Sequence, residues 1–222
     1  MTPMPIVVLV SGEGTNLQAI IDAVRSNRLP VEIRAVISNR PGANGLRRAQ
    51  QAGIPTEVID HTRHPDREGF DAALQTLIDR YRPALVVLAG FMRILTEAFV
   101  THYRGRLINI HPSLLPVFPG LNTHRRALEA GVKEHGASVH FVTNEVDGGP
   151  VIIQVRVPVQ ENDDPHRLAA RVLKREHDLY VTAIRWCAQG RVKLVDGVVC
   201  FDGEVLSKPI DFDQALEMGD IP

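Results

Sequence analysis

The chain has 222 residues, 44% of them hydrophobic, so it can bury a substantial core in one large domain or two small ones. The 25 Lys and Arg residues nearly balance the 26 Asp and Glu residues, which argues against a global preference for nucleic acid or an anionic membrane. The two cysteines, Cys187 and Cys200, lack C-x-x-C spacing; this argues against a disulfide framework or a zinc site and favours a reducing cytoplasm.

The first half of the chain alternates strand and helix patterns. No basic segment followed by a long apolar core precedes the first strand, so no signal peptide is expected. The expected strands are Ile6–Val10, Ile33–Ile37, a short Glu57–Ile59, Leu85–Ala89 and Leu107–His111. The expected helices are Leu17–Val24, Leu46–Ala52, Asp66–Tyr81 and a helix that Thr96 caps and that ends at His102. This alternation predicts an α/β fold with a mainly parallel, twisted, Rossmann-like sheet flanked by helices.

The second half has a different pattern. Its expected elements are the strands Ala137–Val142, Val151–Val159, Arg191–Val195 and Val198–Phe201 and a long helix from Pro165 to Trp186. Asp196-Gly197 between the last two strands predicts an antiparallel C-terminal hairpin. From Ser207 the tail is polar and acidic, so we expect it to be loosely held. We interpret residues 1–222 as a single domain with a nucleotide-binding-like half (1–110), a catalytic half (111–205) and a tail (206–222).

A glycine-containing loop, Ser11–Asn16, lies between the first strand and the first helix. Backbone N–H groups and the positive end of the helix dipole would face such a loop, which favours a phosphate ligand. The loop lacks the Gly-Lys-Ser/Thr of a Walker loop and the third glycine of a dinucleotide fingerprint, so it fits a single phosphate. A tight turn capped by Asn or Thr is the alternative.

Asn109 and His111 end the strand Leu107–His111, which Pro112 terminates. Residues i and i+2 of a strand project from the same face, so the amide and the imidazole should stand side by side. The carboxyl end of a parallel strand is where open α/β sheets bind ligands. An amide donor beside a group that titrates near neutral pH can stabilise an oxyanion and move a proton, which favours acyl or formyl transfer over a purely structural role.

Two loops are further candidates. A carboxylate at Asp147, in the sharp turn Glu145–Pro150, could reach His111 and favour the imidazolium, although the local pattern slightly favours an ordinary Asp-Gly turn. The apolar loop Gly90–Leu95 follows a buried strand and could line a pocket for a flat heterocycle, or simply cover the sheet. The other histidines, His140 among them, show no metal-binding spacing and are interpreted as structural.

A series of motifs in fixed order covers the chain from Ile6 to about Trp186. They are Ile6–Gly12, Asn16–Ile20, Val87–Leu95, Asn109–Pro116, Phe118–Leu121, Glu134–Gly136, Val139–Val142, Asp147–Pro150 and Glu176–His177. On these motifs the chain resembles the glycinamide ribonucleotide transformylase family, the folate-dependent formyltransferases of purine synthesis.

The resemblance implies a role for each group of residues. The catalytic residues would be Asn109, His111 and Asp147. The ribonucleotide would be held by Gly14, Thr15, Asn16 and Glu176. The folate would be bound by Arg67, Met92, Arg93, Ile94, Leu95, Thr143, Asn144, Glu145 and Val146.

The implied reaction moves the formyl group of 10-formyltetrahydrofolate, a cosubstrate, to the amine of N1-(5-phospho-D-ribosyl)glycinamide, in the route to IMP. The resemblance implies a cytoplasmic monomer or homodimer that needs no metal and acts on small molecules, with neither nucleic acid nor membrane as a partner. Glu13 stands where Asn is frequent in the family, and we expect its carboxylate to point into solvent. Leu173 replaces a possible polar contact with packing only, and the tail after Phe201 has little that matches.

Three alternatives remain open. A formyl-folate hydrolase would use the same three residues, but is expected to carry an additional N-terminal domain. A methionyl-tRNA formyltransferase is expected to carry a further C-terminal domain and a basic excess. A catalytically silent nucleotide-binding module could share the scaffold, since fold alone does not decide function.

Overall fold

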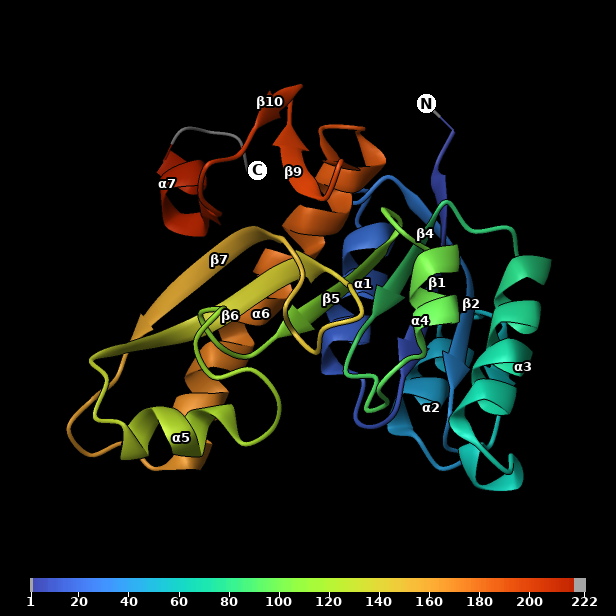
Figure 1. The fold of residues 1–222 in the computed structure, drawn as a ribbon, viewed down its shortest axis with the longest axis horizontal. Coiled ribbons are helices and arrows are strands. Elements are labelled where there is room, and N and C mark those ends of the chain that lie inside the picture. Colours follow the sequence, from blue (N-terminus) through green and yellow to red (C-terminus); the bar gives the residue numbers. More distant parts are fainter. Residues whose placement is uncertain (1, 218–222) are drawn as a thin grey trace. The chain divides into compact units, whose positions relative to one another are not determined.

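The structure is a computed structural model that describes residues 2–217, and the chain divides into two compact units, residues 1–109 and 110–222. The first unit is built on parallel strands in the order β5-β4-β1-β2-β3 (Figure 1). These strands are β1 (Met4–Val10), β2 (Val31–Ser38), β3 (Thr56–Val58), β4 (Leu85–Leu88) and β5 (Leu107–His111). β5 crosses the boundary between the units, since its last two residues belong to the second.

Four α-helices connect these strands: α1 (Thr15–Arg25), α2 (Asn44–Gln51), α3 (Arg67–Arg80) and α4 (Glu97–His102), with a short 3₁₀ helix at His61–Arg63. The chain moves from β1 outward to β3 and then returns to β4 and β5 on the other side of β1. Because such crossovers are right-handed, α1 and α2 cover one face and α3 and α4 the other, in agreement with the contacts within each pair. The direction reverses between β1 and β4, and this reversal is the point where open sheets bind ligands.

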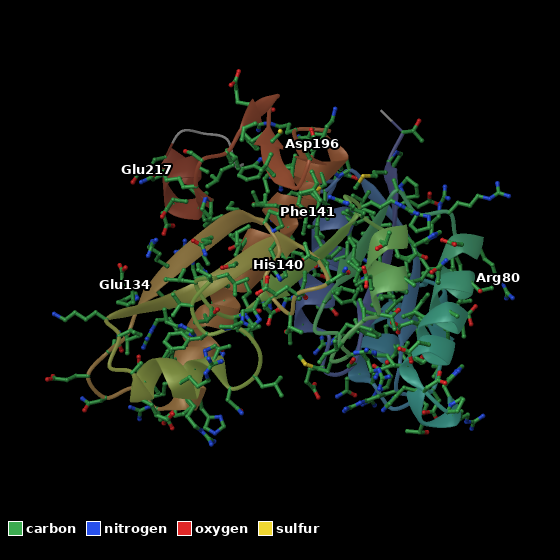
Figure 2. The ribbon with its side chains drawn as sticks, viewed as in Figure 1. Arg80, Glu134, His140, Phe141, Asp196 and Glu217 are labelled. Atoms are coloured by element: carbon green, nitrogen blue, oxygen red, sulfur yellow. The ribbon has the colours of Figure 1, made fainter. Side chains whose placement is uncertain are left out.

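The second unit contains the antiparallel strands β6 (Glu134–Phe141) and β7 (Val151–Pro158), and β11 (Ile210–Asp211) parallel to β7. The long helix α6 (Pro165–Ala188) packs on β6 and β7, and α5 (Thr123–Glu129) packs on α6. In Figure 2, His140 and Phe141 of β6 lie among crowded side chains, whereas Glu134 at the other end of the strand projects outward. A separate antiparallel sheet holds β8 (Val192–Val195), β9 (Val198–Phe201) and β10 (Glu204–Val205).

The α/β fold class, with a mainly parallel sheet flanked by helices and an antiparallel C-terminal hairpin, is confirmed, and each predicted strand and helix is present near its expected bounds. The prediction of a loosely held tail is wrong for the segment that begins at Ile210, because β11 pairs with β7 and α7 (Phe212–Glu217) buries Phe212. Residues 218–222 lie outside the described part. The single-domain interpretation stays a prediction. In the described range, no helix is long and apolar enough to cross a membrane.

Candidate active site

Ser11 connects the loops that follow β1 and β4, at the point where the strand order of the first unit reverses. Its hydroxyl donates to Asn39 Oδ1 at 2.6 Å and accepts from the backbone N–H of Met92 at 2.8 Å. Its own N–H donates to the Gly90 carbonyl at 3.1 Å. The loop after β1, predicted to hold phosphate, therefore lies directly beside the loop after β4, predicted to hold a heterocycle. Ser11 itself was missed at the sequence level, because a buried serine carries no local signature of the loops that it joins.

The start of α1 is shaped for an anion. Gly14 is the N-cap residue with φ +70°, and no side chain caps the helix, which contradicts the alternative of a turn capped by Asn or Thr. A Cβ on Gly14 would lie 2.6 Å from Gly45 Cα, so glycine is required there. The first turn of the helix, which begins at Thr15 and Asn16, presents backbone N–H groups at the positive end of the helix dipole. Glu13 is exposed, as expected, and its carboxylate accepts from Asn44 Nδ2 at 2.9 Å.

The predicted folate segment Met92–Leu95 is fixed at both ends. Ser11 holds the N–H of Met92, and at the other end buried Asp71 accepts from the N–H of Thr96 at 2.5 Å. Burial raises the pKa of Asp71, although the hydrogen bond from Thr96 opposes this shift. Between these anchors the side chains of Met92 and Ile94 are exposed, which leaves apolar surface at a strand end.

Two predicted folate-binding arginines lie near this segment. The guanidinium of Arg93 lies 4.8 Å from the centroid of the Phe70 ring on α3. Arg67 is exposed in the first turn of the same helix, and both arginines act electrostatically on Asp71. The structure thus brings Arg67, Arg93 and the Met92–Leu95 segment into one region of the first unit.

His111 lies at the end of β5 and is buried. Its Nε2 is 2.9 Å from the backbone carbonyl of Phe118, and its Nδ1 is 3.3 Å from Asp147 Oδ2. A carbonyl oxygen only accepts, so Nε2 carries the proton of its contact with Phe118, and Nδ1 faces the carboxylate of Asp147.

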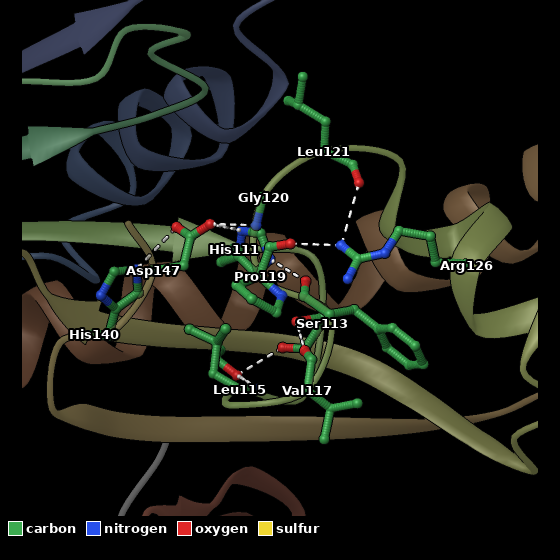
Figure 3. A network of polar contacts seen from close by, with 12 residues as sticks. His111, Ser113, Leu115, Val117, Pro119, Gly120, Leu121, Arg126, His140 and Asp147 are labelled. Carbon is green, nitrogen blue, oxygen red and sulfur yellow. Dashed lines mark hydrogen bonds and ion pairs between the residues drawn. The ribbon is translucent and has the colours of Figure 1, made fainter. Parts of the chain in front are cut away.

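The Asp147 loop is shaped by its glycines. Asp147 has φ +53°, and its Oδ2 also accepts from the N–H of Gly120 at 2.8 Å. A Cβ on Gly149 would lie 1.8 Å from the Phe141 carbonyl oxygen, so the return of the loop along β6 requires glycine. The turn is therefore more than an ordinary Asp-Gly turn, because it carries the carboxylate to His111. Figure 3 shows the contacts of Asp147 with His111 and with Gly120.

His140, interpreted as structural from the sequence, lies on the other side of Asp147. Its Nε2 is 3.7 Å from Asp147 Oδ1, and its Nδ1 is 2.9 Å from the Phe141 carbonyl, to which it donates. Burial is the main influence on this ring and lowers the pKa of His140, so it stays neutral and leaves the charge of Asp147 to His111. The missed signal was its place on the strand that directly precedes the Asp147 loop.

Two further histidines, His124 and His135, contact each other, and His135 also contacts the segment that follows β5. His135 Nε2 is 3.1 Å from His124 Nδ1, and a ring N–H of His135 donates to the Pro112 backbone. Burial lowers the pKa of His135 to about 4 and also lowers that of His124, so both rings are neutral near pH 7. The pair connects α5 to β6.

The remaining predicted residues lie on β5, on α6 and in the Asp147 loop. Asn109 is half-buried on β5, two positions before His111. Glu176 is buried on α6. In the Asp147 loop, Asn144, Glu145 and Val146 are exposed, and Thr143 is half-buried. Among residues 2–217, no cluster of three or more His, Cys, Asp or Glu side chains is arranged to hold a metal ion, and the absence of a metal requirement stays a prediction.

A histidine held by a carboxylate at the carboxyl end of a strand, in an α/β fold, is an arrangement suited to group transfer. The formyl transferase family profile matches residues 4–184, and the chain belongs to this family; it is a formyltransferase.

Relatives of known name agree closely with this chain. It is 55% identical over 203 residues to phosphoribosylglycinamide formyltransferase of Escherichia coli, covering 91% of this chain and 96% of the relative. The corresponding Haemophilus influenzae protein is 45% identical over the same coverage. Among solved structures, phosphoribosylglycinamide formyltransferase from Coxiella burnetii superimposes with a TM-score of 0.91 at 55% identity, covering 95% of this chain and 99% of that one. Glycinamide ribonucleotide transformylase 1 from Symbiobacterium toebii gives 0.87 at 47% identity, covering 90% and 94%.

Proposed function

We propose that this formyltransferase moves the formyl group of 10-formyltetrahydrofolate to the amine of N1-(5-phospho-D-ribosyl)glycinamide, a step of purine synthesis leading to IMP. The observation that carries the proposal is the contact between His111 Nδ1 and Asp147 Oδ2 at 3.3 Å, because it supplies a charged acid at the end of β5. The relatives named for this activity, matched over nearly their whole length, supply the choice of substrates.

In the proposed reaction the substrate amine attacks the formyl carbon, and negative charge develops on the formyl oxygen. Side chains alternate along β5, so Asn109 and His111 project from the same face of the strand. The Asn109 amide donates a hydrogen bond to the developing oxyanion, and the His111 imidazolium neutralises it. The bond between the formyl carbon and N10 of the folate then breaks.

The proton released by the amine must reach the departing N10. Asp147 is the group suited to this transfer, since its carboxylate holds the His111 imidazolium and can orient a water molecule between the two nitrogens. Neutral His140 on its other side supports this role, because it does not compete for the charge. Binding both substrates together supplies proximity, worth up to about 7–11 kcal/mol when the geometry is right.

Substrate binding is assigned to the groups already described. The glycine loop at Gly14, Thr15 and Asn16 holds the ribonucleotide phosphate, and the family resemblance of the Glu176–His177 motif supports a contact of Glu176 with the same substrate. The folate is assigned to three segments: Arg67, Met92 to Leu95, and Thr143 to Val146. The exposed Met92 and Ile94 side chains suit a flat heterocycle.

The setting of the enzyme is part of the proposal. We place it in the cytoplasm as a monomer or homodimer that acts on small molecules, with neither a metal nor a nucleic acid nor a membrane required. The near balance of 25 basic and 26 acidic residues supports the part of this assignment that excludes nucleic acid and an anionic membrane as partners.

Mass spectrometry of glycinamide ribonucleotide incubated with enzyme and 10-formyltetrahydrofolate tests the proposal. The expected result is the gain of one formyl group on the amine, together with tetrahydrofolate. Free formate without the formylated product would instead identify a hydrolase. Ligand binding with neither product would identify a silent nucleotide-binding module.

A further inference from the structure

The backbone of a three-residue segment, Phe118 to Gly120, forms hydrogen bonds with both His111 and Asp147. The Phe118 carbonyl accepts from His111 Nε2 at 2.9 Å, and the Gly120 N–H donates to Asp147 Oδ2 at 2.8 Å. We call Phe118–Gly120 the backbone clamp. The orientation of the His111 ring and the position of the Asp147 carboxylate therefore depend on where this clamp lies.

The start of the loop that carries the clamp is fixed by a buried polar network. The Ser138 hydroxyl donates to the Ser113 carbonyl at 2.6 Å and accepts from the N–H of Leu115 at 3.0 Å. Gln154 Nε2 donates to the Leu115 carbonyl at 2.8 Å and to Ser138 Oγ at 2.9 Å. These bonds end before the clamp, so something else must hold the clamp itself.

That holder is Arg126 on α5. Its Nη1 donates to the carbonyls of Pro119 and Leu121, on either side of Gly120 (Figure 3). Its guanidinium also lies 5.5 Å from the centroid of the Phe118 ring. One planar cation thus touches the two backbone units that flank the Asp147 donor and the residue that accepts from His111. α5 is itself anchored, because His124 pairs with buried His135 of β6.

We infer that Arg126 is a positioning residue for formyl transfer: by fixing the backbone clamp it orients His111 and Asp147, without touching either. The inference rests on the proposed catalytic roles of that pair. A lysine could neutralise the same charge but lacks the planar guanidinium that lies over the Phe118 ring, so charge and geometry can be separated experimentally.

Steady-state kinetics of R126A, R126K and R125A test the inference. Arg125 is the matched control, since it is exposed on the same short helix. We expect R126A to lower kcat about tenfold to a hundredfold with little change in KM for either substrate, as for a small misplacement of reacting groups. R126K should fall between R126A and the parent, and R125A should match the parent.

Side-chain ¹H–¹⁵N NMR of His111 supplies a readout that general destabilisation would not change. The parent should show protons on both ring nitrogens, and R126A should lose the signal of the Nε2 proton bound to Phe118. R126Q, which keeps an amide donor, is measured alongside in case R126A does not fold.

Two results would overturn the role of Arg126: a kcat for R126A equal to that of R125A, or a lowered kcat with unchanged His111 signals. An H111A variant, measured in parallel, separates this failure from that of the catalytic assignment. Lost turnover in H111A with an unaffected R126A rejects Arg126 alone. Retained turnover in H111A rejects the roles on which the inference rests.

Discussion

The His111 ring lies between the Phe118 carbonyl and the Asp147 carboxylate, and the proposed reaction assigns it the role of an acid. Substituting H111A or N109A should lower kcat about 100- to 1,000-fold, the usual cost of losing one group that stabilises an oxyanion. Substrate binding should be largely kept, because neither group is assigned to ground-state binding. Kinetics of both variants beside H166A, a substitution of an exposed histidine on α6, check this prediction. Turnover that survives in both variants would refute the mechanism.

Because its ring is buried, His135 should make the stability of the protein sensitive to acid. Its pKa is lowered from 6.5 to about 4 by burial, so between these values the unfolded chain binds a proton that the folded chain does not. The stabilisation is therefore complete above about pH 6.5 and is lost as the pH falls toward 4. The parent should lose up to about 3 kcal/mol of unfolding free energy over this window.

Urea unfolding of the parent and of H135Q at pH 7 and pH 4.5 measures this loss. Glutamine keeps a donor and an acceptor but does not titrate in this range, so H135Q should lose less stability on acidification. His124, whose pKa is also lowered by burial, acts in the same direction in both proteins. Equal losses would show that His135 is not the group responsible.

Individual residues of the candidate site differ in whether the sequence alone identifies them. The spacing of Asn109 and His111 at a strand end was sufficient to single them out, because strand alternation is a local rule. Nothing local to Asp147 shows that its loop reaches His111, since that contact joins residues far apart in the chain. His140 and Arg126 were missed for the same reason.

The turn from β1 to α1 depends on one glycine. G14A would place a Cβ 2.6 Å from Gly45 Cα and force alanine into a left-handed conformation, which alone costs about 1–2 kcal/mol. We expect a lower Tm and a KM for the ribonucleotide raised roughly tenfold, equivalent to about 1.4 kcal/mol of binding. G12A is the control for stability, because nothing lies within 4 Å of a Cβ there. An unchanged KM in folded G14A would argue against phosphate binding at this turn.

The C-terminal helix α7 is anchored by Phe212. This side chain is buried, and the Arg175 guanidinium, which also pairs with Asp213, lies 5.3 Å from its ring centroid. F212A should destabilise the protein by about 3–5 kcal/mol, as for other buried aromatic truncations. L216A, on the same helix but 42% exposed, should cost about 0.5 kcal/mol or less. Chemical denaturation measures both, and equal small effects would mean that α7 adds nothing to stability.

At the level of elements, the sequence predicted those strands and helices whose apolar residues follow a clear pattern. The apolar runs of β1 and β4 are buried throughout, as expected for strands covered on both faces. α5 was not predicted because it buries only two residues of its seven, Thr123 and Ala127, and so has no apolar stripe. The tail was misjudged because its few apolar residues, spaced among acidic ones, pack on distant elements.

At the level of the molecule, the alternation of strands and helices was sufficient for the fold class but not for strand order. The reversal between β1 and β4 places the loops that follow these two strands side by side, and Ser11 joins them. Right-handed crossovers restrict such orders without selecting one. The loops were therefore predicted separately, and their adjacency required the structure.

Whether the chain unfolds as one domain is a further prediction, and β5 carries it. The boundary between the units, after Asn109, falls inside this strand, so melting either unit removes part of an element of the other. Unfolding should then be a single cooperative transition. The one tryptophan, Trp186, is buried against Phe201 in the second unit, so its fluorescence reports that unit, whereas far-UV circular dichroism reports both. Coincident urea midpoints from the two probes are expected, and separated midpoints would mean that residues 1–109 and 110–222 unfold as two domains.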